Sequence, residues 1–437
     1  MDITKCLFAG LLLLYFSLST TQAQDTIRLS RQESEVRFLS KNLLLLAEKL
    51  KIPQAEALTL QAKLWPNPTL EIDEINIGTT ANGLNGTGYF GEGLPPIAGN
   101  FGKNQQISAS IEQLVLTAGK RKKLIALEEV NESMAEAYFQ ELLRSLKLEF
   151  RNSLSDLQYL QYSKNLHLAQ LKSIEQLSTA YLKQVQQGNV SQGEYIRLKA
   201  AELEIAKSIN DLDDEIISKQ KDLKLLLNLP PNAVLELTEE NFELDISRFK
   251  QLSLGELSEK ALESRPDYKL EVLGQEYAQK NYLYEKAQRV PDITFKAGYD
   301  RGGNFLYNFF GLGLSMDLPV FNRNQGAIKH AEYALKTSEI LSQYKAEEIG
   351  NELILSWQEL QNSIALYQKI DPDYEHTLDK LLENYVSNFK KRDIDMLAFL
   401  DFMEAYLENK TIILENKLDI QKKTEEFNYT LGTDLFN

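Results

Sequence analysis

The chain has 437 residues and a mass of 49.9 kDa, which allows two or three ordinary domains or one unusually large architecture. Hydrophobic residues make up 43% and charged residues 25%, a composition that excludes a disordered chain. The 48 Lys and Arg residues against 63 Asp and Glu residues give a net charge of −15, so the chain lacks the basic surface that neutralises nucleic-acid phosphates. We therefore expect no nucleic-acid partner, and the low number of prolines, 11, favours long helices.

Residues 1–23 have the pattern of a secretory signal peptide. An apolar run from Leu7 to Leu18 is too short to span a bilayer as a helix, and the small residues Thr21 and Ala23 precede the expected cleavage site. Cys6 lies ahead of this run, where it does not fit a lipid-attachment cysteine, and it leaves with the signal. The mature chain then has no cysteine for a disulfide, a thiolate metal site or a nucleophile. No later segment approaches 18 uninterrupted apolar residues, so we expect no membrane-spanning helix.

The rest of the chain contains two similar halves. At an offset of 204 residues, the segment Tyr181–Leu198 aligns with Tyr385–Phe402. The matched positions are Tyr181/Tyr385, Val185/Phe389, Val190/Ile394, Tyr195/Phe399 and Leu198/Phe402. Each half reads as a short helix, a proline-containing stop, two strands and two very long helices, which indicates an internal duplication.

Proline-free runs with a helical period predict very long helices. From about Gly119 to Gln187, apolar residues recur at steps of three and four, as on the inner face of a coiled coil. They are Leu143, Leu146, Phe150, Leu154 and Leu157. At about 1.5 Å per residue such a helix is roughly 100 Å long, far beyond a usual globular helix. The first return helix is expected over Ser191–Leu227.

The second half offers a matching helical run from Gln325 to Lys391, interrupted by Asp371-Pro372. That dipeptide reads as an N-cap followed by proline at the first helical position, so we expect a kink or restart of the helix there. The second return helix is expected over Asp393–Leu431. Its predicted inward stripe consists of Leu400, Met403, Leu407, Leu414 and Leu418.

Four segments close to the length of a tilted transmembrane strand, about 9–11 residues, alternate between apolar and small or polar side chains. The candidate strands are Thr69–Ile77, Gln105–Val115, Asp292–Asp300 and Asn308–Val320. One face is therefore apolar and the other polar, which suits lipid on one side and water on the other. A long exposed loop, Thr79–Lys103, is expected in the first pair and a short one, Arg301–Tyr307, in the second. A small soluble antiparallel sheet is the alternative interpretation.

Four strands are too few to close a membrane barrel, because the smallest such barrels have about eight. Open strand edges in lipid would leave backbone groups without hydrogen-bond partners. Identical chains must therefore combine. Three copies supply twelve strands, and two copies would supply eight, which is also enough by arithmetic alone. We expect a homotrimer whose long helices continue the barrel as a helical tube.

The chain resembles a TolC-type outer-membrane efflux factor over essentially its whole mature length. The motifs that carry the resemblance are LWPNPTLE (Leu64–Glu71), GKRKK (Gly119–Lys123), GNVSQGEYIRLKAAE (Gly188–Glu202), LLNLP (Leu226–Pro230), RPD (Arg265–Asp267) and LPVFNRNQGAIKHA (Leu318–Ala331). The stretch LPVFNRNQG is most similar to the branch that serves heavy-metal cation pumps, the CzcC-like and CusC-like proteins. The resemblance implies a mainly α-helical chain with a transmembrane β-barrel portion. Each chain would hold a duplicated half, four strands and long antiparallel coiled-coil helices, and a trimer would complete a 12-stranded barrel and an α-helical tunnel.

The resemblance also implies an order of parts along the chain. We expect a signal peptide (1–23), N-terminal periplasmic helices (24–65), a first strand pair with a long exposed loop (66–118), a first long helix pair (119–228), an equatorial segment (229–265), a short helix (266–290), a second strand pair (291–321), a second long helix pair (322–432) and a C-terminal tail (433–437).

The implied function is that of a passive exit duct in the bacterial outer membrane that extends into the periplasm. Its expected partners are two further copies of the chain, a periplasmic adaptor protein, an inner-membrane RND-type pump and outer-membrane lipid. Heavy-metal cations are the expected cargo, with organic compounds or dyes, or proteins exported by a type I secretion system, as alternatives. No enzymatic activity and no cofactor are expected.

The resemblance places adaptor contacts at two turns between the long helices. In the first turn Gly188, Asn189, Val190 and Ser191 match the family pattern. The second turn offers Lys391, Arg392 and Asp393 as its contact residues. Arg392 stands where the family has a glycine, which leaves the shape of this turn open. Solvated charges on an exposed turn are the alternative interpretation of these residues.

A candidate pore gate follows the second turn. Asp401 matches one position of an aspartate ring that closes the tunnel in several relatives, and Asp395 lies two turns before it, where it too is a gate candidate. Three copies of one carboxylate would repel one another and attract cations, so such a ring would both gate and select. An ordinary solvent-facing carboxylate on a helix is the alternative interpretation.

No other chemistry stands out. His167, His330 and His376 are far apart in the sequence, and no cluster of His, Cys or Glu has metal-ligand spacing, so no metal site is predicted. The rival in a different functional class is a secreted coiled-coil interaction protein with a small soluble sheet. A salt wash should release that rival, whereas a duct should need detergent.

Overall fold

The structure is a computed structural model that describes residues 25–73, 107–238, 254–301 and 308–435. The predicted signal peptide, the predicted long loop and nearly all of the predicted short loop lie outside the described residues. The chain forms two compact units, each of which draws on both halves of the sequence. The sheet unit consists of Leu50–Phe139 and Pro266–Glu347, and the helical unit consists of Met1–Lys49, Gln140–Arg265 and Glu348–Asn437.

The sheet unit contains four strands and the helices that lead into and out of them. Its elements are α4 (Lys51–Lys63), β2 (Thr69–Asp73), β3 (Ile107–Val115), α8 (Pro266–Gln288), β5 (Ile293–Arg301), β6 (Phe309–Met316) and the first parts of α5 (Lys120–Gln186) and α9 (Gln325–Tyr367). All four predicted strands are therefore present. The last strand ends at Met316 rather than at the predicted Val320, because proline at position 319 has no N–H for a strand ladder.

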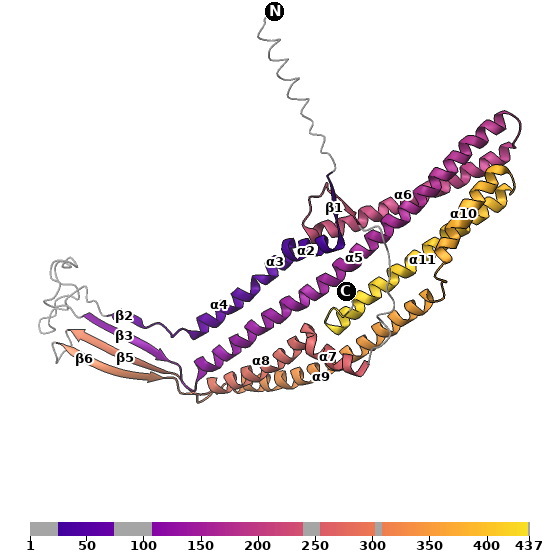
Figure 1. Ribbon diagram of the computed structural model, residues 1–437. Helices are drawn as coiled ribbons and strands as arrows, with labels where there is room; N and C mark the ends of the chain where they lie inside the picture. Colours follow the sequence, from indigo (N-terminus) through magenta and orange to yellow (C-terminus); the bar gives the residue numbers. More distant parts are fainter. Residues whose placement is uncertain (1–24, 74–106, 239–253, 302–307, 436–437) are drawn as a thin grey trace, which may run out of the picture. The chain divides into compact units, whose positions relative to one another are not determined.

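The four strands form one antiparallel sheet in the order β2-β3-β5-β6. The central pair joins the two sequence halves, with Ile111 opposite Ala297 and Val115 opposite Ile293. Strand β2 pairs with β3 on one side and β6 with β5 on the other, so β2 and β6 are the edges of the sheet. Every strand end that adjoins a helix lies at the same end of the sheet (Figure 1). We call this the helix end of the sheet.

A buried ion pair joins the two halves at the helix end. Lys120, the first residue of α5, is 4% exposed, and its Nζ lies 2.8 Å from Oδ1 of Asp292, just before β5. Burial disfavours the Asp292 carboxylate, but hydrogen bonds from Lys120 and from the Thr117 N–H outweigh this and lower its pKa. Gly119, with a φ of 67°, and Asn324, with a φ of 57°, stand directly before α5 and α9, so both long helices start after a left-handed residue.

The helical unit contains the remaining long helices and a small sheet that the sequence did not predict. Its elements are β1 (Thr26–Leu29), α2 (Arg31–Lys41), α3 (Leu43–Lys49), α6 (Gln192–Leu227), β4 (Val234–Leu237), α7 (Leu254–Ser264), α10 (Tyr374–Lys391), α11 (Met396–Leu431) and the later parts of α5 and α9. Strands β1 and β4 pair in parallel although 208 positions separate Arg28 from its ion-pair partner Glu236. Helix α5 has 67 residues, roughly 100 Å at about 1.5 Å per residue, as predicted.

The predicted inner stripe of α5 is confirmed. Leu146, Phe150, Leu154 and Leu157 are all less than a tenth exposed, and Leu143 lies beside them half-buried. The ring of Phe150 stacks on that of Phe38 from α2, with centroids 4.6 Å apart. The helix period alone was therefore enough to identify this buried face.

The predicted stripe of α11 is wrong in phase. Of its five members only Met403 is fully buried, and the four leucines are half-buried. The buried positions instead follow two heptad series, Met396, Met403, Thr424 and Leu431, and Phe399, Tyr406, Ile413, Ile420 and Phe427. Leu400, Leu407 and Leu414 each lie one residue beyond a member of the second series, at the flank of the same face. The helix packs against more than one neighbour, so the larger aromatic and β-branched side chains occupy the centre.

The predicted interruption of the second long helix is present, but its N-cap is a different residue. Helix α9 ends at Tyr367, and α10 begins at Tyr374 with Asp373 as its N-cap. The Tyr374 N–H donates to the Asp371 carbonyl at 2.9 Å, which closes a four-residue turn with Pro372 at its second position. Proline favours that position of a turn because its φ is already suitable, so the dipeptide forms the turn before the helix.

An ion cluster fastens the end of the chain to the helical unit. The Arg151 guanidinium, 11% exposed, contacts Glu35 at 2.9 Å, Glu425 at 2.8 Å and Asp434 at 3.0 Å. Lys147 also contacts Asp434, at 2.5 Å. Burial disfavours the Asp434 carboxylate, but hydrogen bonds and attraction from Lys147 and Arg151 lower its pKa below the ordinary value. The residues just after α11 are thus tied to α5.

A buried arginine holds the C-terminal end of α11. Arg265, 1% exposed, lies between α7 and α8 and donates to Glu352 at 2.7 Å and to the Thr430 carbonyl at 3.2 Å. Gly432, with a φ of 77°, ends α11 against this side chain. An added Cβ there would lie 2.9 Å from Arg265 Cγ, so the close approach requires glycine.

Candidate functional site

The first predicted turn closes α5 with a Schellman motif. The Gly188 N–H donates to the Val185 carbonyl at 3.0 Å, and the Asn189 N–H donates to the Gln184 carbonyl at 2.9 Å. Gly188 has a φ of 76°, the left-handed conformation that this motif needs. Ser191 then caps α6: its hydroxyl accepts from the Glu194 N–H, and the Glu194 carboxylate accepts from the Ser191 N–H. The chain therefore reverses direction between the end of α5 at Gln186 and the start of α6 at Gln192.

The second predicted turn has the same shape although it has no glycine. The Arg392 N–H donates to the Phe389 carbonyl at 3.0 Å and the Asp393 N–H to the Asn388 carbonyl at 2.9 Å. Arg392 adopts a φ of 67° in the place of Gly188, 204 positions later. Asp395 stands at the N-cap of α11, where Ser191 stands for α6, and its Oδ1 accepts from the Ala398 N–H at 2.8 Å. The internal repeat therefore extends to individual hydrogen bonds, and the replacement of glycine leaves the turn's shape unchanged.

The two turns pack against each other in one aromatic cluster. Phe389, 2% exposed, stacks on Tyr181 from the first half at 5.3 Å and on Phe399 from α11 at 4.4 Å. Leu198 from α6 belongs to the same buried cluster. Outside the cluster, Arg392 Nη2 donates to Gln184 Oε1 at 3.3 Å. We call these two turns and their shared cluster the tip.

The tip presents the predicted contact residues to solvent. Gly188, Asn189 and Ser191 in the first turn are exposed, and Val190 is half-buried. In the second turn the exposed residues are Lys391, Arg392 and Asp393. The tip surface therefore combines a small polar turn with a turn that carries two cations and one carboxylate. Exposed charges of this kind can contribute electrostatic complementarity to a protein partner.

The two gate candidates have different surroundings. The Asp395 carboxylate is held as the N-cap of α11. Asp401 is exposed on the second turn of α11 and has no ion pair or hydrogen bond from its side chain within the described part of the chain. Of these two carboxylates, that of Asp395 accepts a hydrogen bond within the described residues and that of Asp401 does not.

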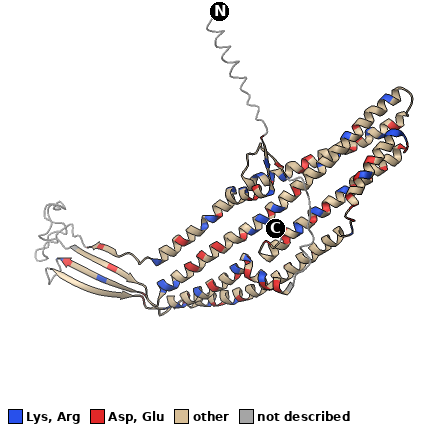
Figure 2. Cartoon of the chain, in the orientation of Figure 1, with Lys and Arg blue, Asp and Glu red and all other residues tan. Residues whose placement is uncertain are grey.

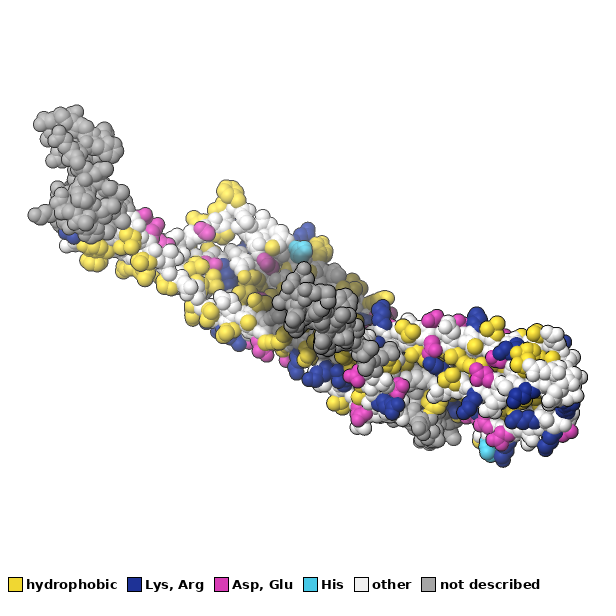
Figure 3. Space-filling view, turned by 90° about the horizontal axis from the view of Figure 1, so that it is seen from above, with side chains coloured by type: hydrophobic (Ala, Val, Ile, Leu, Met, Phe, Trp, Pro, Cys, Tyr) yellow, Lys and Arg dark blue, Asp and Glu magenta, His cyan; other side chains and the backbone are white. Residues whose placement is uncertain are grey.

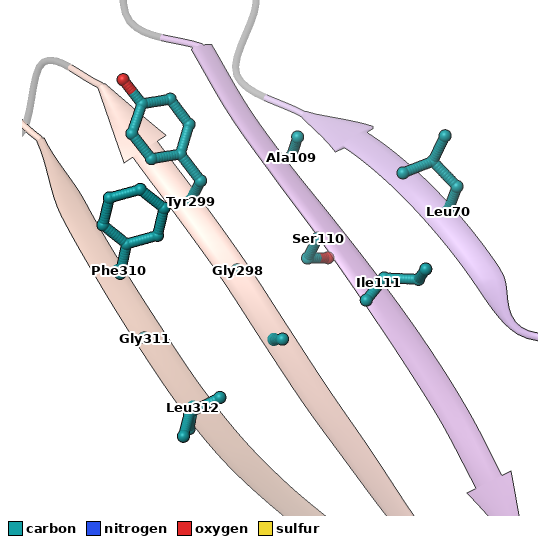
Figure 4. Close-up of a pocket in the computed structure, with 10 residues that line it drawn as sticks. Leu70, Ala109, Ser110, Ile111, Gly298, Tyr299, Phe310, Gly311 and Leu312 are labelled. Carbon is teal, nitrogen blue, oxygen red and sulfur yellow. The ribbon is translucent and has the colours of Figure 1, made fainter.

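The sheet has one apolar face, as its alternation predicts. Cross-strand register puts Leu70, Ile111, Ala297 and Leu312 in one row and Ile72, Ala109, Tyr299 and Phe310 in the next. All of these side chains except Ile72 line a shallow hollow (Figure 4), and hydrophobic side chains are visible over the sheet in the space-filling view (Figure 3). Leu312 is 92% exposed and Phe310 78%. An apolar face this exposed needs a partner or a lipid environment.

The opposite face of the sheet is polar and acidic. Lys296 lies between two carboxylates, 2.8 Å from Glu112 and 3.2 Å from Glu71. Asp73 and Asp300 lie in the next row on the same face. The described part of this face therefore carries four carboxylates and one ammonium group. The alternation of side chains identified this face. The ion pairs of Lys296 with Glu112 and Glu71 depend on how the strands pair, which the sequence alone did not predict.

Within the described residues, no group of three or more His, Cys, Asp or Glu side chains could hold a metal ion. Helices that are both long and apolar enough to cross a membrane are also missing from the part of the chain that the structure describes.

The comparisons with known proteins give matches to solved structures alone. No protein-family model matches the sequence, and no curated protein sequence matches it. A structure of CusC is 18% identical, with a TM-score of 0.69 and coverage of 96% of both chains. The outer-membrane protein VceC of Vibrio cholerae is 15% identical, with a TM-score of 0.68 and coverage of 93% of this chain and 96% of VceC. The open state of the outer-membrane channel MtrE of Neisseria gonorrhoeae is 14% identical, with a TM-score of 0.68 and coverage of 92% of this chain and 89% of MtrE.

At identities this low, the structural matches establish the fold alone. They do so over nearly the whole chain. Two long helical hairpins, a four-stranded sheet and the order of elements occur together in one duplicated chain. The chain therefore has the fold of TolC-type outer-membrane channels, as its motifs predicted.

Proposed function

We propose that this protein is the outer-membrane exit channel of a tripartite efflux system, which passes cargo passively from a pump and its adaptor to the exterior. The observation that carries the proposal is the sheet, with one exposed apolar face, one polar face and two open edges. Lipid on the apolar side and water on the polar side would suit both faces. The shared fold with solved outer-membrane channels supports the same function.

Assembly as a homotrimer would complete the channel. Edge strands β2 and β6 of neighbouring copies would pair, so that three copies close a barrel of twelve strands without edges in lipid. Helix α6 supports this assembly with an exposed stripe, Ile196, Leu203 and Ile217, whose members are seven and fourteen positions apart. Such heptad spacing suits packing against a long helix of a second copy.

The tip is the proposed contact with a periplasmic adaptor, beyond which an inner-membrane RND-type pump would deliver the cargo. Exposed small residues of the first turn and the cations of the second support a protein partner with complementary acidic groups. Asp401 is the proposed gate residue, because its exposed carboxylate would meet two copies of itself if it faced the axis of a trimer. Asp395 would contribute to the gate through the start of α11, which its carboxylate caps.

Heavy-metal cations are the proposed cargo. The LPVFNRNQG motif (Leu318–Gly326) supports this choice, and so does the excess of carboxylates on the polar face of the sheet, which would line the exit of a trimeric barrel. Organic compounds and dyes are the next candidates, and protein export by a type I system is the third. A channel of this kind needs no chemistry of its own, so an enzymatic role is not proposed.

A secreted coiled-coil interaction protein remains the rival of a different class. Membrane fractionation separates the two: the channel should sediment with the outer membrane and require detergent, whereas the rival should be released by high salt or carbonate. Release without detergent would refute the channel.

A susceptibility panel on a strain without this protein then tests the cargo. It compares zinc, cobalt, cadmium, copper and silver with detergents, dyes and antibiotics. Sensitivity to metals alone, restored by the intact gene but altered by Asp401→Ala, is the expected result. Asp214→Ala is the matched control, because Asp214 is an exposed carboxylate on α6. Sensitivity to organic compounds alone would refute the metal cargo and leave the channel in place.

A further inference from the structure

Cations gather at the helix end of the sheet although the chain as a whole is strongly acidic. The four segments that join helix and strand there, residues 60–68, 116–126, 284–292 and 317–330, hold nine Lys or Arg residues and three Asp or Glu residues. Figure 2 marks Lys and Arg positions in blue on the helix ends beside the sheet. A net charge of −15 for the whole chain makes this local excess unexpected.

Three of these cations surround one open hollow of about 590 Å³ between the end of α8 and the start of α9. They are Arg289, Arg323 and Lys329, and all three are exposed. Arg289 and Lys329 have no ion pair within the described residues. The one carboxylate that lines the hollow, Glu332, is held by Lys336 at 2.8 Å. The hollow therefore carries three cations against one carboxylate, and that carboxylate is already paired with Lys336.

Local hydrogen bonds hold this basic hollow in shape. Arg323 Nε donates to the Pro319 carbonyl at 3.2 Å, which leaves both terminal nitrogens of the guanidinium available. Asn324 donates through Nδ2 to the carbonyl of Glu285 at 3.0 Å and to its carboxylate at 2.6 Å. This contact ties the start of α9 to the end of α8 and occupies the nearest carboxylate. The Arg323 guanidinium and the two helix ends are thus held in place before any ligand arrives.

Exposed apolar side chains adjoin the basic hollow. Leu318 is 73% exposed, Val320 59% and Phe321 93%, and Phe321 is also part of the hollow's lining. They follow directly after β6, whose Phe310 and Leu312 belong to the apolar face of the sheet. An apolar surface that ends in a rim of aromatic and cationic residues is the pattern of a membrane–water boundary.

We propose that the hollow formed by Arg289, Arg323 and Lys329 binds the phosphate headgroup of an anionic phospholipid in the leaflet that faces the helices. The inference rests on the proposed function, which places the apolar sheet face in lipid. Guanidinium groups match the oxygens of a phosphate with paired hydrogen bonds, and the lysine adds a point charge. Phe321, Leu318 and Val320 would contact the upper acyl chains. The bound headgroup fixes the depth of the sheet in the membrane at its helix end.

Native mass spectrometry of the purified, folded protein tests the headgroup site, with phosphatidylglycerol as the probe and phosphatidylcholine as the neutral comparison. The triple variant Arg289→Gln, Arg323→Gln and Lys329→Gln removes three charges from the hollow. Each cation near an anionic membrane surface raises the binding affinity roughly fivefold. Removal of three cations should therefore lower the affinity for phosphatidylglycerol on the order of 100-fold. The matched control, Lys183→Gln, Lys207→Gln and Lys221→Gln, removes three exposed charges from α5 and α6 of the helical unit and should bind like the wild type.

A second measurement separates failure of this inference from failure of the proposed function. Trp65 lies at the helix end of the sheet, and in a Trp357→Phe background it is the only tryptophan of the chain. Quenching of Trp65 by brominated phosphatidylcholine in vesicles would show that the sheet enters lipid. The headgroup site alone is overturned if Trp65 is quenched but mass spectrometry shows no preference for phosphatidylglycerol. It is also overturned if Trp65 is quenched and the control variant loses as much phosphatidylglycerol affinity as the triple variant. No quenching overturns the membrane placement and the headgroup site together.

Discussion

Removal of the Phe389 ring should loosen both turns of the tip at once. Phe389 is 2% exposed and lies between Tyr181 of the first hairpin and Phe399 of the second. Phe389→Ala would leave a cavity between these rings while every backbone group of the Arg392 turn stays available for its hydrogen bonds. The variant therefore tests whether the two turns are held together by this side chain.

The expected cost follows from burial and ring contacts. Truncation of a fully buried phenylalanine to alanine costs about 3–5 kcal/mol, and each ring pair accounts for about 0.5–1.5 kcal/mol beyond its buried area. Since 1.4 kcal/mol is a factor of ten, local opening of the tip should become roughly 100- to 4,000-fold more frequent. Opening of the tip alone does not require unfolding of the whole helical unit.

Hydrogen–deuterium exchange is the assay, read in peptides from both hairpins. Peptides around residues 381–403 and around residues 174–198 should both lose protection by about 100-fold or more, whereas peptides from the sheet unit should not change. Leu397→Ala is the matched control, because Leu397 is 67% exposed on the same hairpin. If only the second hairpin loses protection, or if Leu397→Ala has an equal effect, the two turns do not share a core and the reasoning is refuted.

Three further predictions concern single positions. Arg392→Gly should stabilise its turn by up to about 1 kcal/mol despite the lost bond to Gln184, because glycine adopts a φ of 67° without a Cβ penalty; faster exchange of the turn amides would contradict this. Gly432→Ala should destabilise the helical unit by about 1–3 kcal/mol, because its Cβ would lie 2.9 Å from Arg265 Cγ, and an unchanged unfolding midpoint would contradict this. The pKa of Asp434 is lower in the folded protein than in the unfolded chain, so its ionised form stabilises the fold. This stabilisation is fully present above the ordinary pKa of about 3.9 and is lost as the pH falls through the lowered pKa. Below about pH 4 the wild-type unfolding midpoint should therefore fall more steeply than that of Asp434→Asn, and parallel curves would contradict this.

Local patterns in the sequence were enough to predict the long helices and the alternation of the strands. The stripe that ends at Leu157, the proline-free run of α5 and the alternation of Ile107, Ala109 and Ile111 in β3 are all patterns among residues close together in the sequence. Helix periodicity, capping and strand alternation depend on neighbours at most one or two turns away, so a single sequence contains the information. The duplication gave the same signals twice, which made the order of elements clear.

Contacts between distant segments decided the rest. The parallel pair β1–β4, the phase of the buried face of α11 and the buried contact of Arg265 with Glu352 join positions that are far apart in the sequence. The left-handed φ of Arg392 also belongs here, because the surrounding cluster keeps an arginine in a conformation that its own propensity opposes. A segment's period shows that it has an apolar side. Which residues form the centre of that side depends on how many neighbours pack against it, and only the tertiary structure supplies those neighbours.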